Sequence, residues 1–112
     1  MRVEQYRLEV FREPNGFKVD YEEINEVPFI HFTFITDKIT PTLIKMLKIV
    51  DEQISDVLYE EGYDDLFSYT SQDNHSVIQL AKKFGYKELK RVQDQIIFKK
   101  SLKKERDEEC QE

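Results

Sequence analysis

Two histidines and one cysteine are the first residues whose types could do chemistry. His31 lies in an apolar run on the same parity as Thr33, where it would act either as a base beside a cleft or as a hydrogen-bonded histidine of a strand. His75 lies in the first turn of a predicted helix, where an exposed structural role is the simpler interpretation. The histidines stand far apart without HxH or HExxH spacing, and Cys110 is the only cysteine, so we predict no metal site.

Four further polar residues could contribute to a ligand site. Asn74 would either bind a ligand or cap the helix that follows it. Tyr69 and Tyr86 could donate protons, although strand tyrosines more commonly pack with a satisfied hydroxyl. Lys38 could bind an anion near a helix start, but a single lysine is a weak signal. We therefore name no catalytic residue.

The apolar pattern predicts that strands carry the first half of the chain. Residues 3–11 alternate apolar and charged side chains, and Pro14-Asn15-Gly16 predicts a turn because Pro presets φ while Asn and Gly tolerate positive φ. A second alternating strand begins at Phe17. Residues 28–36 are apolar on both parities, which is typical of a central strand covered on both faces.

Helix signals divide the second half of the chain. Thr40-Pro41 provides a hydroxyl cap and a proline at the first helical position, and an apolar stripe predicts a helix over residues 41–61 that ends at Gly62. A strand at 65–71, a helix capped by Asp73 or Asn74 and ending at Gly85, and a hairpin turning near 92–95 follow it. The order β-β-β-α-β-α-β-β predicts an α/β or α+β fold with helices packed on a mixed sheet.

Length, charge and composition limit the class of protein. The 112 residues fit one domain over 1–102, followed by a charged tail at 103–112 that we predict to be disordered. A net charge of −6 disfavours general nucleic-acid binding. We expect no membrane-spanning segment and no signal peptide, and a lone cysteine suits a reducing compartment, so we predict a cytoplasmic protein.

The stretch "NHSVIQLAKKFGY" resembles a motif of the GNAT superfamily of acyl-CoA N-acyltransferases. The family pattern runs from Asn through an apolar residue and Leu-Tyr to Gly and an aromatic residue. The matching positions are Asn74, Val77, Leu80, Ala81, Phe84, Gly85 and Tyr86. The strand "FTFIT" before a long helix resembles the family's acyl-CoA-binding unit, and "IIFKKSL" resembles its closing strand. The resemblance covers residues 17–102 and implies a GNAT-like, mostly antiparallel sheet that lacks the family's two N-terminal helices.

Two departures from the family bear on activity. The family's pyrophosphate loop uses glycines that let backbone N–H groups approach phosphates. The segment "TDKITPT" has no glycine, Pro41 removes a donor, and Asp37 adds negative charge. The tyrosine that often serves as general acid in the family falls at Ala81, which cannot deliver a proton. Thr33, Phe34, Ile35 and Asn74 are the positions that the resemblance assigns to the cofactor, as vestiges.

This degenerate pattern resembles the GNAT-like small proteins of tailed phages, including the internal virion protein type. Matching pieces are Thr36-Asp37, Tyr63-Asp64 and the helix from Asn74 to Gly85. The resemblance implies a non-catalytic protein without a cofactor, which acts in assembly or genome delivery in host cytoplasm or virion. Its implied partners are other proteins, among them virion proteins or a second copy of itself.

Two alternatives remain open. One is an atypical N-acyltransferase that binds acetyl-CoA through the backbone amides of Thr33–Ile35, with Asn74 orienting the pantetheine arm. The other is an inhibitor of a host enzyme, whose acidic surface of Glu22, Glu23 and residues 60–65 would mimic nucleic acid.

Overall fold

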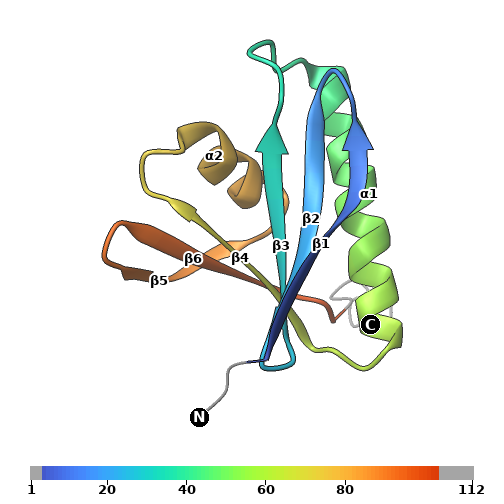
Figure 1. Ribbon diagram of the computed structural model, residues 1–112, viewed down its shortest axis with the longest axis vertical. Helices are drawn as coiled ribbons and strands as arrows, with labels where there is room; N and C mark the ends of the chain where they lie inside the picture. Colours follow the sequence, from blue (N-terminus) through green and yellow to red (C-terminus); the bar gives the residue numbers. More distant parts are fainter. Residues whose placement is uncertain (1–3, 104–112) are drawn as a thin grey trace, which may run out of the picture.

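The computed structural model describes residues 4–103, which form two helices and six strands (Figure 1). The strands are β1 (Gln5–Glu13), β2 (Phe17–Ile24), β3 (Val27–Phe34), β4 (Asp65–Ser71), β5 (Lys87–Val92) and β6 (Gln95–Ser101). The helices are α1 (Pro41–Glu60) and α2 (His75–Lys83). The predicted order β-β-β-α-β-α-β-β is confirmed.

All six strands belong to one sheet in the order β1-β2-β3-β4-β6-β5. Neighbouring strands run antiparallel except β3 and β4, which are parallel. The fold is therefore α+β with a mixed, mostly antiparallel sheet, as predicted. The apolar strand β3 occupies a central position, also as predicted.

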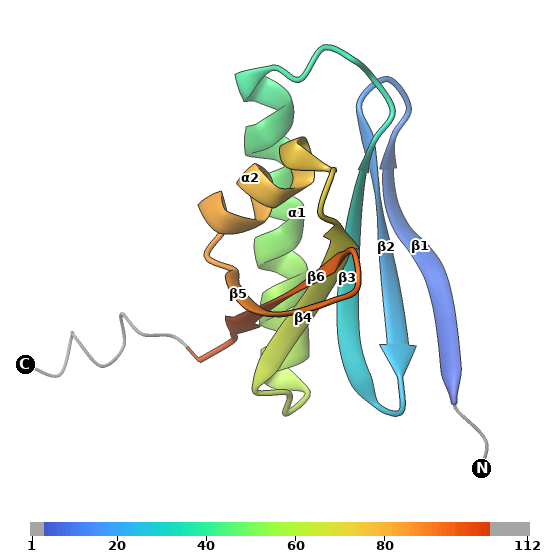
Figure 2. The ribbon, with the colours of Figure 1, turned by 90° about the vertical axis from the view of Figure 1, so that its left-hand side faces the viewer.

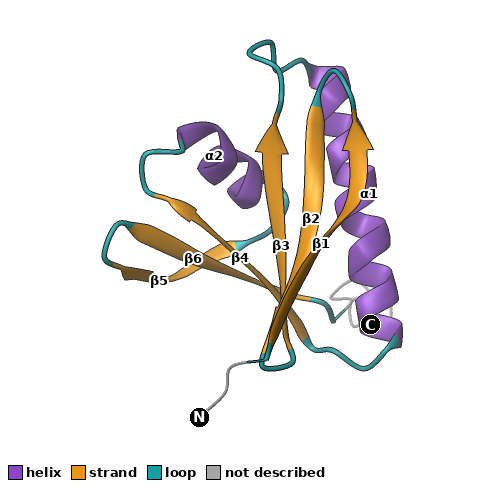
Figure 3. Cartoon of the chain, viewed as in Figure 1, coloured by secondary structure: helices purple, strands orange, loops and turns teal. Residues whose placement is uncertain are grey.

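Both helices pack on the same face of the sheet, which leaves the other face without a helix (Figures 2 and 3). This helix-bearing face holds one core, to which Phe17, Ile30 and Phe98 contribute from three strands. Helix α2 joins it through Phe84, whose ring meets the edge of Phe32 at 6.1 Å between centroids. The single core follows from strand alternation, because one parity of each strand faces the helices.

The predicted signals at the ends of the helices are found in the structure. Thr40 is the N-cap of α1, and its hydroxyl accepts a hydrogen bond from the Leu43 amide at 3.2 Å. Gly62 has a φ of 101°, the left-handed conformation that commonly follows a helix and favours glycine. Asn74, rather than Asp73, is the N-cap of α2.

The turn before β2 has a different physical origin from the one predicted. Pro14-Asn15-Gly16 forms the turn, but neither Asn15 nor Gly16 has a positive φ. A Cβ atom at Gly16 would lie 2.5 Å from the end of the Leu43 side chain, so a larger residue there would require that side chain of α1 to move. Positive φ occurs instead at Asn25 and Glu26, in the tight turn between β2 and β3.

The middle of β3 is buried on both faces, as the sequence predicts, but within residues 4–103 helices cover only one of these faces. Ile30 and Phe32 face the helices, whereas Phe29 and His31 face the side without a helix. His31 is nevertheless buried there, because Tyr69 packs edge-on against it at 4.6 Å between ring centroids. On the helix-free face, side chains of neighbouring strands therefore bury part of β3.

Strands β3 and β4 separate soon after they pair. Their register contains the single pair Phe29↔Phe67, and the two strands diverge towards their carboxyl ends (Figure 1). Beyond Phe29, the backbone of β3 that faces β4 has no strand partner among residues 4–103. This separation creates a gap in the sheet's hydrogen bonding, which α2 flanks in Figure 1.

A charged contact lies inside the core between α1 and the last hairpin. The Asp51 carboxylate accepts a hydrogen bond from the Tyr86 hydroxyl at 2.7 Å and forms an ion pair with Lys100 at 2.5 Å. The Asp51 side chain is 2% exposed and that of Lys100 is 14% exposed. Burial and the Asp51 charge hold the pKa of Tyr86 well above its usual value.

The predicted tail at 103–112 lies, apart from residue 103, outside the described residues, as does Cys110. At the boundary, Leu102 is buried and its amide donates to the Asp64 carbonyl, which places residue 102 within the domain. Neither helix within residues 4–103 combines the length and apolar character needed to cross a membrane.

Candidate functional site

The carboxyl end of β3 and the start of α2 form a cleft that brings together three of the four predicted cofactor positions. Thr33, Phe34 and Asn74 line one depression of about 340 Å³. The strand places Thr33 and Phe34 side by side, and the β4–α2 connection returns Asn74 to them. The cleft lies beside the separation of β3 and β4, where an extended ligand could meet unpaired backbone.

Ile35, the fourth predicted position, stands apart from these three. Its amide donates to the Gly16 carbonyl at 2.8 Å, so this N–H is not available to a ligand. Its side chain is 44% exposed and does not line the cleft. A ligand held by successive amides of Thr33–Ile35 would first have to break the contact with Gly16.

The charges around the cleft are mixed. Asp37 lines the same depression as Asn74, which opposes an anionic group at that point. Lys82 and Lys83 line an adjoining hollow of about 660 Å³, with Phe34 shared between the two hollows. Asn74 itself caps α2 through a long hydrogen bond of 3.4 Å from the Val77 amide. Among the residues that line these two hollows, the lysines that could meet a phosphate group lie on the α2 side.

The family's acid position and Tyr86 both face the core. Ala81, at the family's acid position, is 1% exposed and faces the hydrophobic cluster. Tyr86, considered as a substitute, is 2% exposed and donates to Asp51. Neither lines the described cleft.

A buried polar cluster that the sequence did not indicate lies on the helix-free face. The Glu22 carboxylate, 2% exposed, accepts hydrogen bonds from Gln5, from the Tyr69 hydroxyl at 2.8 Å and from His31 Nε2 at 2.7 Å. Asp20, its neighbour on that face, pairs with Arg7 at 3.0 Å. The cluster thus joins four strands through one carboxylate.

The protonation states of this cluster follow from burial and hydrogen bonding. Burial lowers the pKa of His31, and the hydrogen bond to Glu22 only partly opposes this. Burial also disfavours the Glu22 anion, but the bonds from His31, Tyr69 and Gln5 outweigh it and lower its pKa. His31 is therefore a neutral base at pH 7, with Nε2–H donated to an ionised Glu22.

The burial of Glu22 removes it from the acidic surface that the inhibitor hypothesis requires. Glu23 is also engaged, because it accepts hydrogen bonds from Tyr21 at 2.8 Å and Tyr63 at 3.0 Å. These contacts raise the pKa of both phenols: burial is the larger cause at Tyr21, and the bond to Glu23 is the larger at Tyr63. Two of the glutamates in that hypothesis are thus structural.

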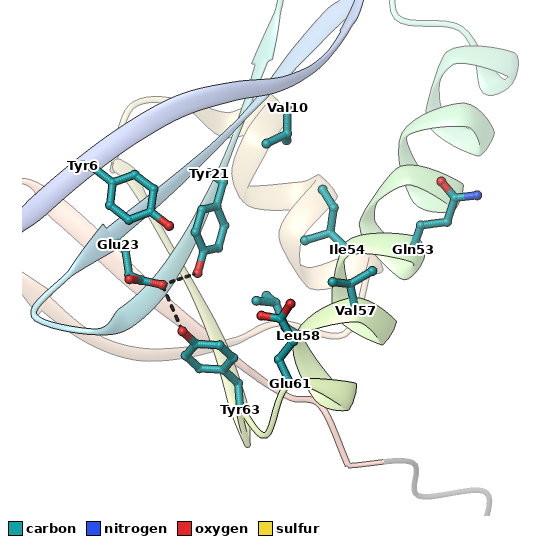
Figure 4. Close-up of a pocket in the computed structure, with 10 residues that line it drawn as sticks. All are labelled: Tyr6, Val10, Tyr21, Glu23, Gln53, Ile54, Val57, Leu58, Glu61 and Tyr63. Carbon is teal, nitrogen blue, oxygen red and sulfur yellow. Dashed lines mark hydrogen bonds between the residues drawn. The ribbon is translucent and has the colours of Figure 1, made fainter.

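A second hollow, the β1–α1 groove, lies between β1 and the second half of α1 (Figure 4). It has a volume of about 330 Å³. Its lining is mostly apolar and aromatic: Tyr6, Val10, Tyr21, Glu23, Gln53, Ile54, Val57, Leu58, Glu61 and Tyr63. The carboxylates of Glu23 and Glu61 are its only charged groups within the described residues. The sequence signal for it is the alternation of apolar and charged side chains over residues 3–11, which gives the first strand one apolar face.

No group of three or more acidic, histidine or cysteine side chains within residues 4–103 is arranged to hold a metal ion.

Solved structures similar to this one show which fold the chain has. An acetyltransferase from Bacillus cereus superposes with a TM-score of 0.56 at 18% identity, over 88% of this chain and 74% of its own. A proposed acetyltransferase from Sphaerobacter thermophilus superposes with a TM-score of 0.51 at 14% identity, over 88% of this chain and 66% of its own. Neither a family model nor a curated protein matches the sequence. The chain therefore has a GNAT-like acetyltransferase fold.

Proposed function

We propose that this protein acts through protein contacts and not by acyl transfer, as an assembly or genome-delivery component of the phage type that its sequence resembles. The observation that carries the proposal is the surface formed by β1 and the β1–α1 groove. Strand β1 lies at the edge of the sheet, and eight of its nine residues are exposed. Its apolar side chains Tyr6, Leu8 and Val10 are each more than 40% exposed.

An exposed apolar edge of this kind has a physical cost unless it is covered. Unpaired N–H and C=O groups on an edge strand are a template for another strand, and proteins usually blunt such edges. Here Val57 of α1, 54% exposed, extends the apolar surface across the groove. Apolar surface rimmed by carboxylates is typical of a protein interaction site.

The cleft at the end of β3 supports the same conclusion. Phosphate binding at a helix N-terminus needs backbone N–H groups and favourable charge. Pro41 begins α1 without an N–H, and Asp37 lines the cleft. The Ile35 amide is committed to Gly16. Each of these features weakens binding of the pyrophosphate of acetyl-CoA.

A second candidate function is N-acyl transfer, and one specific observation favours it. His31 is a neutral histidine held by the Glu22 carboxylate, two residues beyond the pair Phe29↔Phe67 where the strands separate. In such a reaction the base removes a proton from the acceptor amine, the nitrogen attacks the thioester carbonyl, and the thiolate leaves. The leaving thiolate would lack a tyrosine donor at position 81.

Thermal unfolding with acetyl-CoA and with CoA separates the two functions. A ligand at 100 times its dissociation constant stabilises a fold by about 2.7 kcal/mol, or on the order of 10 °C for a domain of this size. We expect no rise at millimolar acetyl-CoA. A rise that is lost in Asn74→Ala, but retained in the distant exposed variant Leu89→Ala, would refute the protein-contact proposal.

A direct assay tests the chemistry. Thiol release from acetyl-CoA should match the uncatalysed rate with any amine acceptor. Release that depends on the protein and falls in His31→Gln would establish the transferase and assign His31 as its base.

A further inference from the structure

Strand β1 presents a sequence that complements itself. From Gln5 to Glu9 its register with β2 is unbroken, and the irregularity lies between Glu9 and Phe11. On this regular segment, Tyr6 and Leu8 face the helices, whereas Arg7 and Glu9 face the other side, opposite Glu22 and Asp20 of β2. Apolar and charged residues thus occupy opposite faces of an exposed edge.

We infer that this edge binds a second copy of the chain, by antiparallel pairing of β1 with the partner's β1 about a twofold axis at Leu8. This inference rests on the proposed protein-contact role. In that register Leu8 lies opposite Leu8 of the second copy, Tyr6 opposite Val10, and Arg7 opposite Glu9. Opposite charges and apolar pairs directly across a ladder both stabilise it.

Neighbouring registers are disfavoured by like charges. A twofold axis at Arg7 sets the two arginines against each other, and an axis at Glu9 sets the two glutamates against each other. A shift by a single residue between the strands would place charged side chains opposite apolar ones. Of these registers, the axis at Leu8 is the one that pairs opposite charges on one face and apolar side chains on the other.

Each charged residue already has a partner within its own chain and remains accessible. Arg7 pairs with Asp20 at 3.0 Å and keeps 45% of its side chain exposed. Glu9 pairs with Arg12 at 2.8 Å and keeps 36% of its side chain exposed. The pairing therefore builds a row of alternating charge across the junction, in the order Asp20, Arg7, Glu9 and Arg12. A network of this kind is stronger than isolated surface pairs.

The β1–α1 groove supports the same occupant. Val10 lines the groove and lies within the irregularity between Glu9 and Phe11, so regular pairing ends at Glu9, beside the apolar surface of α1. Tyr6 of the second copy would lie opposite Val10, at the mouth of the groove. A net charge of −6 on each copy opposes association, so we expect a dimer that strengthens as salt screens this repulsion and depends on concentration.

Sedimentation equilibrium of the whole chain across a concentration series tests the pairing. We expect the native protein to approach twice its monomer mass of 13.5 kDa. Leu8→Lys should raise the dissociation constant about tenfold or more, because it replaces the apolar Leu8–Leu8 pair by two lysines that face each other. The matched control is Leu89→Lys on β5, the opposite edge strand, where the leucine is 51% exposed, and it should leave the dimer intact.

A charge exchange distinguishes pairing in this register from non-specific association. Arg7→Glu and Glu9→Arg should each weaken the dimer when studied alone. An equimolar mixture of the two variants should associate more tightly than either alone, because a mixed dimer sets Glu opposite Arg at both cross-strand positions while the within-chain losses at Asp20 and Arg12 stay the same. A monomer at all concentrations, an equal loss in Leu89→Lys, or a mixture that associates no more tightly than either variant alone would each overturn the pairing. The protein-contact role is judged separately: a monomer without acetyl-CoA binding refutes only the pairing, whereas a dimer that binds acetyl-CoA refutes only the role.

Discussion

Replacing Lys100 should destabilise the protein more than replacing its partner Asp51. The two side chains form an ion pair of 2.5 Å between α1 and β6, but Asp51 is 2% exposed and Lys100 is 14% exposed. Removing one partner of a buried pair typically costs about 3–5 kcal/mol, because the remaining charge is left without compensation in the interior. Lys100→Met leaves the Asp51 carboxylate with the Tyr86 hydroxyl as its one side-chain partner in the described part of the chain.

Replacing Asp51 should lower the free energy of unfolding by less than replacing Lys100. In Asp51→Asn the amide oxygen can still accept the Tyr86 hydroxyl, and Lys100 can extend its ammonium towards water from its partly exposed position. We expect a loss of about 1–2 kcal/mol for this variant. Lys100→Met should lose about 3–5 kcal/mol, which corresponds to a fall in Tm of roughly 12–20 °C.

Urea unfolding at pH 7 measures both free energies. Lys99→Met is the matched control, because Lys99 is the neighbouring lysine, is 44% exposed and lies 3.8 Å from Asp65. Its effect should stay within about 0.5 kcal/mol. Equal midpoints for Lys100→Met and Lys99→Met would refute the reasoning, since the buried carboxylate would then need no cation.

Three further perturbations test other parts of the fold. The pKa of His31 is lower in the folded protein than in the unfolded chain, where it is about 6.5. The contribution of His31 to the free energy of unfolding should therefore be complete above the unfolded pKa of about 6.5 and be lost as the pH falls through the folded pKa. In His31→Gln the slope of Tm against pH in this window should be smaller. Thr40→Ala should cost about 1 kcal/mol in chemical unfolding by removing the α1 cap, and an unchanged midpoint would contradict that role. Gly16→Ala should cost about 1 kcal/mol, because the end of the Leu43 side chain must move, and the same change should cost less in a Leu43→Ala background; an equal cost in both backgrounds would exclude this contact as the cause.

The elements that sequence predicts well are those with strong local signals. Helix α1 was expected over 41–61 and spans Pro41–Glu60, because a cap, a proline and a regular stripe agree. Strand β4 was expected at 65–71 and spans Asp65–Ser71. The GNAT-like order could be predicted since each element is short and separately marked by turn residues.

The polar clusters could not be predicted in the same way. Glu22 alternates with Tyr21 in a pattern that is typical of a solvent-facing residue, and its partners His31 and Tyr69 lie 9 and 47 residues away. Only the strand order, with the register of β2 on β3, brings them together. Long-range pairing of this kind leaves no local pattern.

The position of Asp51 in the sequence does indicate a buried carboxylate. It follows Leu47 by four residues and precedes Ile54 by three, so it occupies the apolar stripe of the long helix. A carboxylate in that stripe indicates a buried charge that needs a partner. Lys100 carries the matching signal, because it shares a parity with Ile96 and Phe98 of the core.

The tyrosines connect these clusters to the proposed function. Of six tyrosines, four donate their hydroxyls to carboxylates: Tyr21 and Tyr63 to Glu23, Tyr69 to Glu22, and Tyr86 to Asp51. Burial and these carboxylates raise the pKa of all four phenols, which makes each a weaker acid.

The tyrosine that often protonates the leaving thiolate in the GNAT superfamily falls at Ala81, which cannot deliver a proton. The tyrosines best placed by sequence to replace it, Tyr69 and Tyr86, are instead held as hydrogen-bond donors within the sheet and core. Releasing either hydroxyl would leave a buried carboxylate with one partner fewer, at a cost of about 1–3 kcal/mol. The contacts that stabilise the sheet and core therefore hold both tyrosines away from acid catalysis, which is one physical reason for the proposal that this protein acts through protein contacts.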